Sequence, residues 1–101
     1  MKSRALQMAR NYGVRVELAY LGDWGASNLY AEYEPRGPII RLDREYVRAL
    51  SGAKRYTFVS LAIGHELYHH CERIGAVQRI HDRVARENAA DAFARALLPR
   101  A

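Results

Sequence analysis

The segment from Val77 to Leu98 carries the feature that most restricts how this chain can fold. Apolar or small residues recur along it at spacings of three and four, which is the pattern of a helix with one buried face. Two positions on the same stripe, Glu87 and Asp91, are acidic. Unpaired carboxylates in a protein interior are costly unless ions or hydrogen bonds compensate them. The last helix is therefore expected to face a neighbour that supplies this compensation.

The preceding helical segment, predicted over residues 56–72, offers such a neighbour. Residues 65–69 read His-Glu-Leu-Tyr-His, which is the H-E-x-x-H pattern. Positions i and i+4 share one face of a helix, so His65 and His69 can bind one metal ion while Glu66 projects beside them as a general base. The two polar pairs are expected to meet across a helix hairpin.

Two imidazoles and one carboxylate form the ligand set of a catalytic zinc ion, which leaves a fourth position open. Glu87 is the predicted third ligand, and Asp91, one turn further on, is expected to accept the free N–H of a ligating imidazole. Two alternatives stay open on the sequence alone. In the first, His65 and His69 are ordinary helix residues that bind no metal ion. In the second, Glu87 is an exposed ion-pair partner of Arg83 or Arg86 on the same helix.

The remaining polar residues near the motif are predicted to lie outside the site. His70 and His81 could orient a substrate or stabilise an oxyanion, but each is predicted to be a surface histidine. Cys71 is expected to pack in the core, because a lone cysteine on an apolar helix is usually a packing residue and not a nucleophile. Asp82 falls off the acidic stripe and is expected to be solvated.

The first half of the chain is expected to combine helices with a small sheet. The predicted elements are a helix over 3–12, strands over 14–20, 28–34 and 39–42, turns at 22–25 and 35–38, and a helix over 44–51 capped by Asp43 and ended by Gly52. We expect the strands to pair in sequence order as a three-stranded antiparallel sheet. The predicted fold class is α+β, in one domain over residues 1–101: an N-terminal helix, the sheet, then three helices with H-E-x-x-H on the central one.

Charge and composition limit the cellular setting and the partners. The formal net charge is +5, but the arginines are spread from Arg4 to Arg100, which favours a solvated surface over a nucleic-acid face. Cys71 is the only cysteine, so no internal disulfide can form. No signal-peptide pattern and no apolar run of about 20 residues is present. A cytoplasmic protein that does not span the membrane is therefore expected.

Several further residues of the second half match a family pattern. They are Tyr56-Thr57-Phe58, Gly64-His65-Glu66-Leu67-Tyr68-His69, Glu87-Asn88-Ala89-Ala90-Asp91-Ala92-Phe93-Ala94 and Leu97-Leu98-Pro99. This combination resembles the ImmA/IrrE family of metallo-endopeptidases, which pairs H-E-x-x-H with a downstream E-x-x-A-N-x-F-A. The family's glutamate ligand falls on Glu87. Asp91 stands where the family usually has Asn, which is similar to the Glu-then-Asp pair of thermolysin-like zinc peptidases, and Tyr68 replaces a common Gly.

The resemblance implies a zinc-dependent endopeptidase that cleaves a helix-turn-helix repressor of a phage, a mobile element or a stress response. Zn²⁺ is the expected cofactor, with Mn²⁺ or Fe²⁺ as alternatives. We hypothesise that the strand over 39–42 is a sheet edge to which an extended substrate adds. The second reading is a catalytically silent, zinc-stabilised binding module that regulates a repressor by association, and the intact Glu66 speaks against it.

Overall fold

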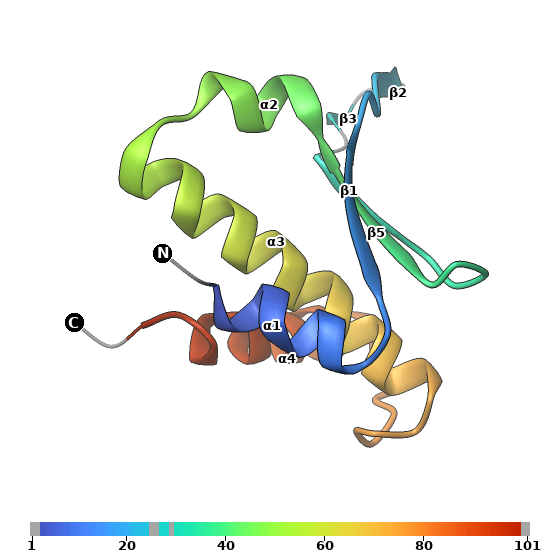
Figure 1. The fold of residues 1–101 in the computed structure, drawn as a ribbon. Helices are drawn as coiled ribbons and strands as arrows, with labels where there is room; N and C mark the ends of the chain where they lie inside the picture. The colour runs from blue at the N-terminus through green and yellow to red at the C-terminus, as the bar shows by residue number, and fades with distance from the viewer. Residues whose placement is uncertain (1–2, 25–26, 29, 100–101) are drawn as a thin grey trace.

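The computed structural model describes residues 3–24, 27–28 and 30–99, which form an α+β fold (Figure 1). In chain order the elements are α1 (Arg4–Asn11), β1 (Arg15–Ala19), β2 (Asp23–Trp24), β3 (Ser27–Asn28), β4 (Ala31–Glu34), β5 (Ile39–Asp43), α2 (Arg44–Ala49), α3 (Gly52–Arg73) and α4 (Arg83–Ala96). The predicted fold class, with a helix, a sheet and then helices, is confirmed. No helix in the described part of the chain is long and apolar enough to cross a lipid bilayer.

β5 lies in the centre of a three-stranded sheet, between β1 and β4. β4 pairs with β5 antiparallel across the predicted turn, whereas β1 pairs with β5 parallel. The prediction of a purely antiparallel sheet was therefore wrong, and so was the hypothesis that strand 39–42 is an edge. The physical reason is burial. Ile39, Ile40 and Leu42 are all buried, and a central position covers this aliphatic strand from both sides.

The segment between β1 and β4 also differs from the prediction. β2 and β3 form a small antiparallel hairpin, with Asp23 opposite Asn28, where only a turn was expected. β4 begins at Ala31 and not at residue 28. Gly25 of the predicted turn and Leu29 of the predicted strand lie outside the described residues.

Side-chain caps fix the starts of the first two helices. The hydroxyl of Ser3 accepts a hydrogen bond from the backbone N–H of Leu6 at 3.2 Å, which caps α1. Asp43 caps α2 as predicted, because its Oδ2 accepts from the N–H of Tyr46 at 2.9 Å. Its Oδ1 accepts from the N–H of Leu21 at 3.0 Å, so the same buried carboxylate also ties the end of β1 to the start of α2.

α3 begins earlier and α4 later than the sequence pattern predicts. Gly52 opens α3 and does not merely end the helix before it. α4 begins at Arg83 because the side chain of Asp82 accepts a hydrogen bond from the N–H of Ala85 at 2.8 Å and caps the helix there. The predicted helix over 77–98 was therefore wrong over 77–82. Asp82 is exposed as expected, but its carboxylate has this structural role.

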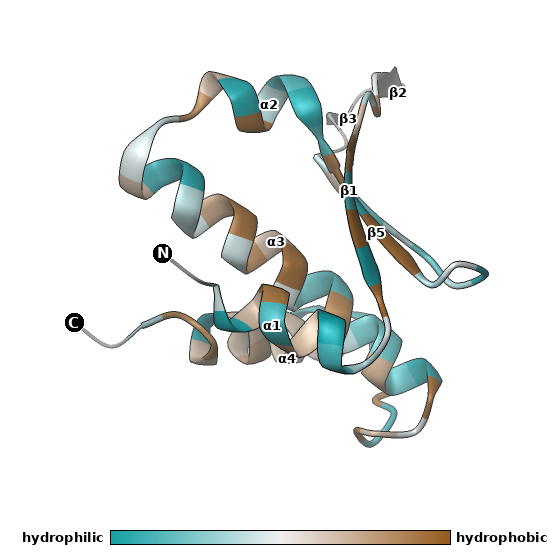
Figure 2. Cartoon of the chain, in the orientation of Figure 1, coloured by the Kyte–Doolittle hydropathy of each residue, from teal (hydrophilic) through white to brown (hydrophobic). Residues whose placement is uncertain are grey.

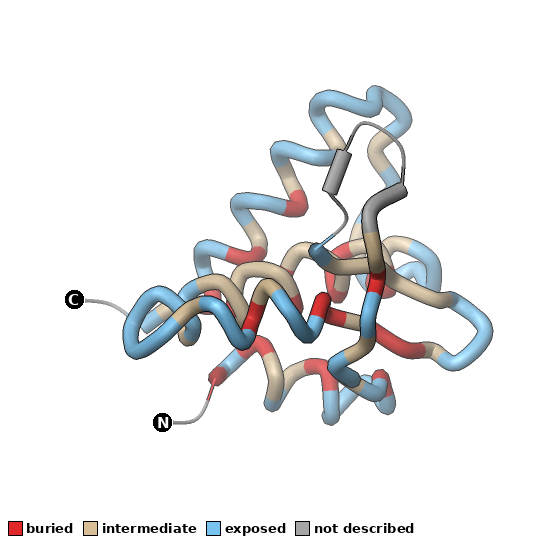
Figure 3. The backbone as a smooth tube through the Cα atoms, turned by 90° about the horizontal axis from the view of Figure 1, so that it is seen from above, coloured by how far each residue is buried: buried red, intermediate tan, exposed pale blue. Residues whose placement is uncertain are grey.

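α3 is the central helix, with α1, α4 and the sheet packed around it (Figure 1). Ile63 and Leu67 of α3 join Ile40 and Leu42 of β5 in the hydrophobic core, and the apolar positions of α3 are visible along its course in Figure 2. Cys71 is fully buried in the same core, which confirms its predicted packing role. Buried and exposed positions alternate along the helices (Figure 3), so each helix buries one face and leaves another free.

Candidate metal centre

His65 and His69 lie one turn apart on α3, on the side that faces α4. Their Nε2 atoms are 3.4 Å apart and their ring planes are inclined by 70°. Both side chains are largely buried yet keep access to solvent, with exposed fractions of 23% and 24%. The helical spacing of four therefore brings both imidazole nitrogens to one point, as the sequence predicts.

α4 places the carboxylate of Glu87 against both imidazoles. Its Oε1 lies 3.4 Å from Nε2 of His65, and its Oε2 lies 3.1 Å from Nε2 of His69. One ligand atom from each of the three residues lies within 4.8 Å of the other two, so His65, His69 and Glu87 could hold a metal ion. Two imidazole nitrogens and a carboxylate oxygen are a donor set that suits Zn²⁺ and also Mn²⁺ or Fe²⁺.

The close approach of α4 to α3 depends on small residues. A Cβ atom added at Gly64 would lie 2.8 Å from both Cα and Cβ of Ala94, so the two helices are nearly in backbone contact there. Ala90 and Ala94 are fully buried on the same face of α4. Because the two helices are this close, the short side chain of Asp91, which follows Ala90 on α4, reaches His65 on α3.

Asp91 contacts the first histidine on the side away from the cluster. Its Oδ1 lies 2.8 Å from Nδ1 of His65. A carboxylate can only accept, so Nδ1–H of His65 donates this hydrogen bond and the lone pair of Nε2 is directed at the cluster. The contact is the one expected of a residue that orients a metal-binding imidazole.

The apolar stripe predicted that Glu87 and Asp91 point into the interior, and this prediction was wrong. The side chains of Glu87 and Asp91 are 49% and 53% exposed, and Val84 on the same stripe is also exposed. The buried face of α4 is formed by Ala90 and Ala94 instead. The predicted burial was wrong because α4 starts at Arg83 and its alanines face the core. The carboxylates of Glu87 and Asp91 therefore lie at the solvent-exposed side of the contact between α3 and α4.

Glu66 lies beside the cluster and forms no hydrogen bond or ion pair with the described part of the chain. Burial raises the pKa of its carboxyl above the usual value; positive charge on His65 and His69 opposes this rise, and the carboxylates of Glu87 and Glu32 add to it. The Glu66 carboxyl is thus a poorly solvated acid–base group, next to the atoms that could hold the metal ion.

Glu72 and Arg86 lie next to the site, and the sequence did not predict this position for either residue. Oε1 of Glu72 lies 3.7 Å from Nδ1 of His69, and its buried Oε2 has no hydrogen-bond partner but lies 3.4 Å from Nε of Arg86. Arg86 therefore faces Glu72, and Glu87 forms no ion pair with an arginine in the described ranges. The spacing of three between His69 and Glu72 is the signal that could have identified this contact.

The two remaining histidines differ from each other. His81 is exposed as predicted. His70 is only 4% exposed, so its prediction as a surface residue was wrong. Nδ1 of His70 lies 2.7 Å from the hydroxyl of Tyr33, which joins α3 to β4, and burial lowers the pKa of the imidazole, with a smaller contribution from Arg73. No local sequence pattern predicts this contact, because Tyr33 is far from His70 along the chain.

The cluster, the Glu66 carboxyl and the Asp91 contact lie together, with three residues that could hold a metal ion on one side and a carboxyl group on the other. Comparison of the chain with protein-family models, with curated proteins and with solved structures found no match. A functional assignment therefore depends on the motif and on the geometry of these side chains.

Proposed function

We propose that this chain is a zinc-dependent endopeptidase in which His65, His69 and Glu87 hold the ion and Glu66 is the general base. The observation that carries the proposal is the convergence of two Nε2 atoms and one carboxylate, at 3.1 to 3.4 Å, beside the Glu66 carboxyl, which forms no hydrogen bond with residues 3–24, 27–28 or 30–99. A purely structural cluster does not require a poorly solvated carboxyl such as that of Glu66 beside it. Zn²⁺ bound by these three residues would supply a Lewis acid that activates water and polarises the scissile carbonyl.

In the proposed reaction Glu66 moves protons between the attacking water and the leaving amine. Its carboxylate accepts a proton from the water as the oxygen attacks the peptide carbonyl, and the protonated carboxyl returns that proton to the amine as the C–N bond breaks. Burial raises the pKa of the Glu66 carboxyl, which makes the carboxylate a stronger base for the first transfer. Asp91 holds the proton of His65 on Nδ1, so the lone pair of Nε2 would be available to bind the ion.

The substrate class follows from the resemblance to ImmA/IrrE peptidases, which implies a helix-turn-helix repressor. The edge of the sheet nearest the site is β4 and not β5, because β4 is an outer strand that contacts α3. We place the extended peptide along β4, where Glu32 lies close enough to influence the Glu66 carboxyl. The cytoplasmic setting remains part of the same proposal.

A peptide-library assay with a matched pair of variants tests the proposed reaction. The zinc-loaded protein is incubated with a degenerate peptide mixture and new N-termini are counted by mass spectrometry. Glu66→Gln is expected to lower cleavage by about 100- to 10,000-fold, the usual contribution of a general base, and to leave zinc binding unchanged. Glu45→Gln, an exposed change on α2, serves as the control. Equal cleavage by Glu66→Gln and the wild type would contradict the assignment, and zinc binding without any cleavage would favour the silent binding module.

A further inference from the structure

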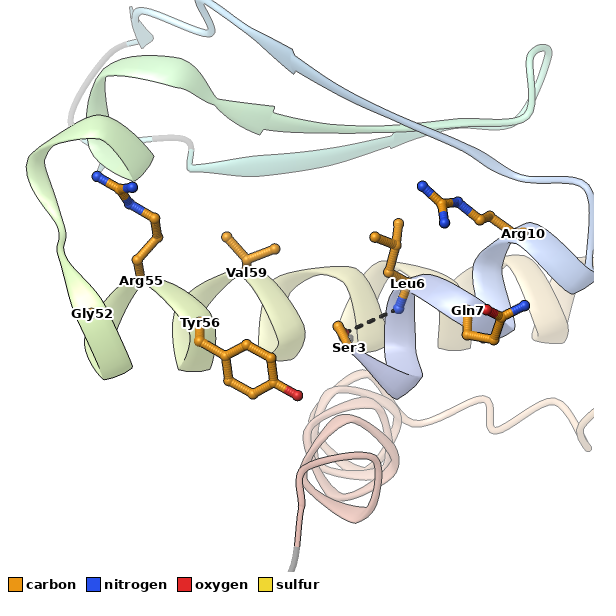
Figure 4. Close-up of a pocket in the computed structure, with 8 residues that line it drawn as sticks. All are labelled: Ser3, Leu6, Gln7, Arg10, Gly52, Arg55, Tyr56 and Val59. Atoms are coloured by element: carbon orange, nitrogen blue, oxygen red, sulfur yellow. Dashed lines mark hydrogen bonds between the residues drawn. The ribbon is translucent and has the colours of Figure 1, made fainter. Parts of the chain in front are cut away.

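A second surface feature lies along β1, at the opposite edge of the sheet from β4. Near this edge, α1 and the first turns of α3 enclose a hollow of about 510 Å³ that is lined by residues of the two helices (Figure 4). Two neighbouring hollows extend it, one along β1 and one toward α2, through the shared residues Arg10 and Arg55. We call these three adjacent hollows together the β1 groove, and its principal lining residues are Leu6, Arg10, Val16, Leu18, Arg55 and Val59.

The β1 groove exists because the helical layer is incomplete under β1. Val14, immediately before β1, is buried, but burial then falls along the strand until Leu18 is 50% exposed. On α3 the lining residues begin at Gly52 and end at Val59 with spacings of three and four, which marks one helix face left open over two turns. In a two-layer α+β fold this position is normally filled by a helix packed on the sheet.

The charges around the β1 groove are almost all positive. Five arginines and one glutamate line the three hollows, which gives the lining a formal charge of +4. The glutamate, Glu17, forms ion pairs with Arg15 and Arg41. The exposed side chains of Arg10 and Arg48 form no ion pair within the described ranges. An occupant of the groove would therefore have to be apolar on one face and acidic at its flanks.

We propose that the β1 groove binds a short amphipathic helix of a protein partner, with aliphatic residues on one face and Asp or Glu on the flanks. The open face of α3 spans roughly 10 Å over two turns, so a helix of about two to three turns fills it. Its aliphatic face covers Leu6, Leu18 and Val59, and its acidic flanks meet Arg10 and Arg48. A second copy of this chain would bring like charges together at the groove, which disfavours self-association there.

The test uses two synthetic stapled helices of about three turns. Both have leucines at spacings of three and four; the flanking residues are glutamates in one probe and lysines in the other. Binding to the full chain is measured by fluorescence anisotropy and mapped by ¹H–¹⁵N chemical-shift changes. The variants are Leu18→Glu, Arg10→Glu and Arg48→Glu, all at exposed positions, and the control is Arg36→Glu in the exposed turn between β4 and β5. Thermal melts check that each variant folds.

The glutamate probe is expected to shift resonances of the β1 groove and to bind at least about tenfold more tightly than the lysine probe. Each groove variant, and also raised salt, is expected to weaken binding of the glutamate probe about tenfold. Arg36→Glu is expected to leave this binding unchanged. Equal binding of the two probes, shifts on another face, or no saturable shift would overturn the proposal. Two other results would also overturn the proposal, because each assigns another occupant to the β1 groove. One is self-association of the chain that Arg10→Glu abolishes, and the other is binding of anionic vesicles at the groove in preference to the probe.

Discussion

Gly64→Ala tests whether the close contact between α3 and α4 builds the metal centre. The new Cβ would lie 2.8 Å from both Cα and Cβ of Ala94, whereas ordinary carbon contacts are 3.5–4.0 Å, so the helices must separate by roughly 1 Å. Overpacking of this kind costs about 1–3 kcal/mol, and the cost should lie near the upper end because backbone must move. Replacing a helical glycine by alanine returns about 1 kcal/mol.

The net effect of Gly64→Ala is a loss of about 1–2 kcal/mol in the free energy of unfolding. For a domain of this size the loss lowers the melting temperature by about 5–15 °C in scanning calorimetry. The separation of the helices also moves Glu87 away from the histidines. Metal–ligand distances tolerate shifts of only about 0.2 Å, so zinc affinity by competition titration should fall at least tenfold. Ala94→Gly removes one of the two contacts and should partly restore zinc affinity in the double variant, but not the melting temperature, because a glycine inside α4 costs about 1 kcal/mol. An unchanged melting temperature with wild-type zinc affinity would refute the argument.

Two further substitutions give expected outcomes of different kinds. Asp91→Ala removes the acceptor of the imidazole N–H and should weaken zinc binding about 10- to 100-fold, with little change in melting temperature of the metal-free protein; unchanged zinc affinity would show that the contact has no role. Asp43→Ala removes a helix cap and also the partner of the buried N–H of Leu21, so urea titration should show a loss of about 2–4 kcal/mol. Asp82→Ala, which removes an exposed cap alone, should lose only about 1 kcal/mol, and equal losses would contradict this account.

The part of the site that sequence could predict is the part set by local periodicity. His65 and His69 are four residues apart on one helix, so their meeting needs no knowledge of the rest of the chain. Glu87 was placed correctly against them by its position on the next helix. The reason given for that placement was wrong, because Glu87 is half exposed and the core face of α4 is formed by alanines.

The features that sequence missed depend on long-range geometry. The pairing of β1 with β5 joins strands separated along the chain by three other strands, and no local pattern predicts their order. The burial of His70 depends on Tyr33, which reaches it from the sheet. The start of α4 was missed for a local reason, since Asp82 is a good helix cap and its effect outweighed the apolar spacing of the residues before it.

Zinc content is the most direct test of the proposed metal centre. The wild-type protein, Glu87→Ala and Glu45→Ala are treated with a mild chelator, restored with zinc, dialysed and measured by elemental analysis. Glu45 is exposed on α2 and serves as the matched carboxylate control. We expect about one zinc ion per chain in the wild type and in Glu45→Ala, and little zinc in Glu87→Ala, because two imidazoles alone hold the ion weakly. A wild-type protein without zinc, or equal zinc in all three proteins, would contradict the assignment of His65, His69 and Glu87 as ligands.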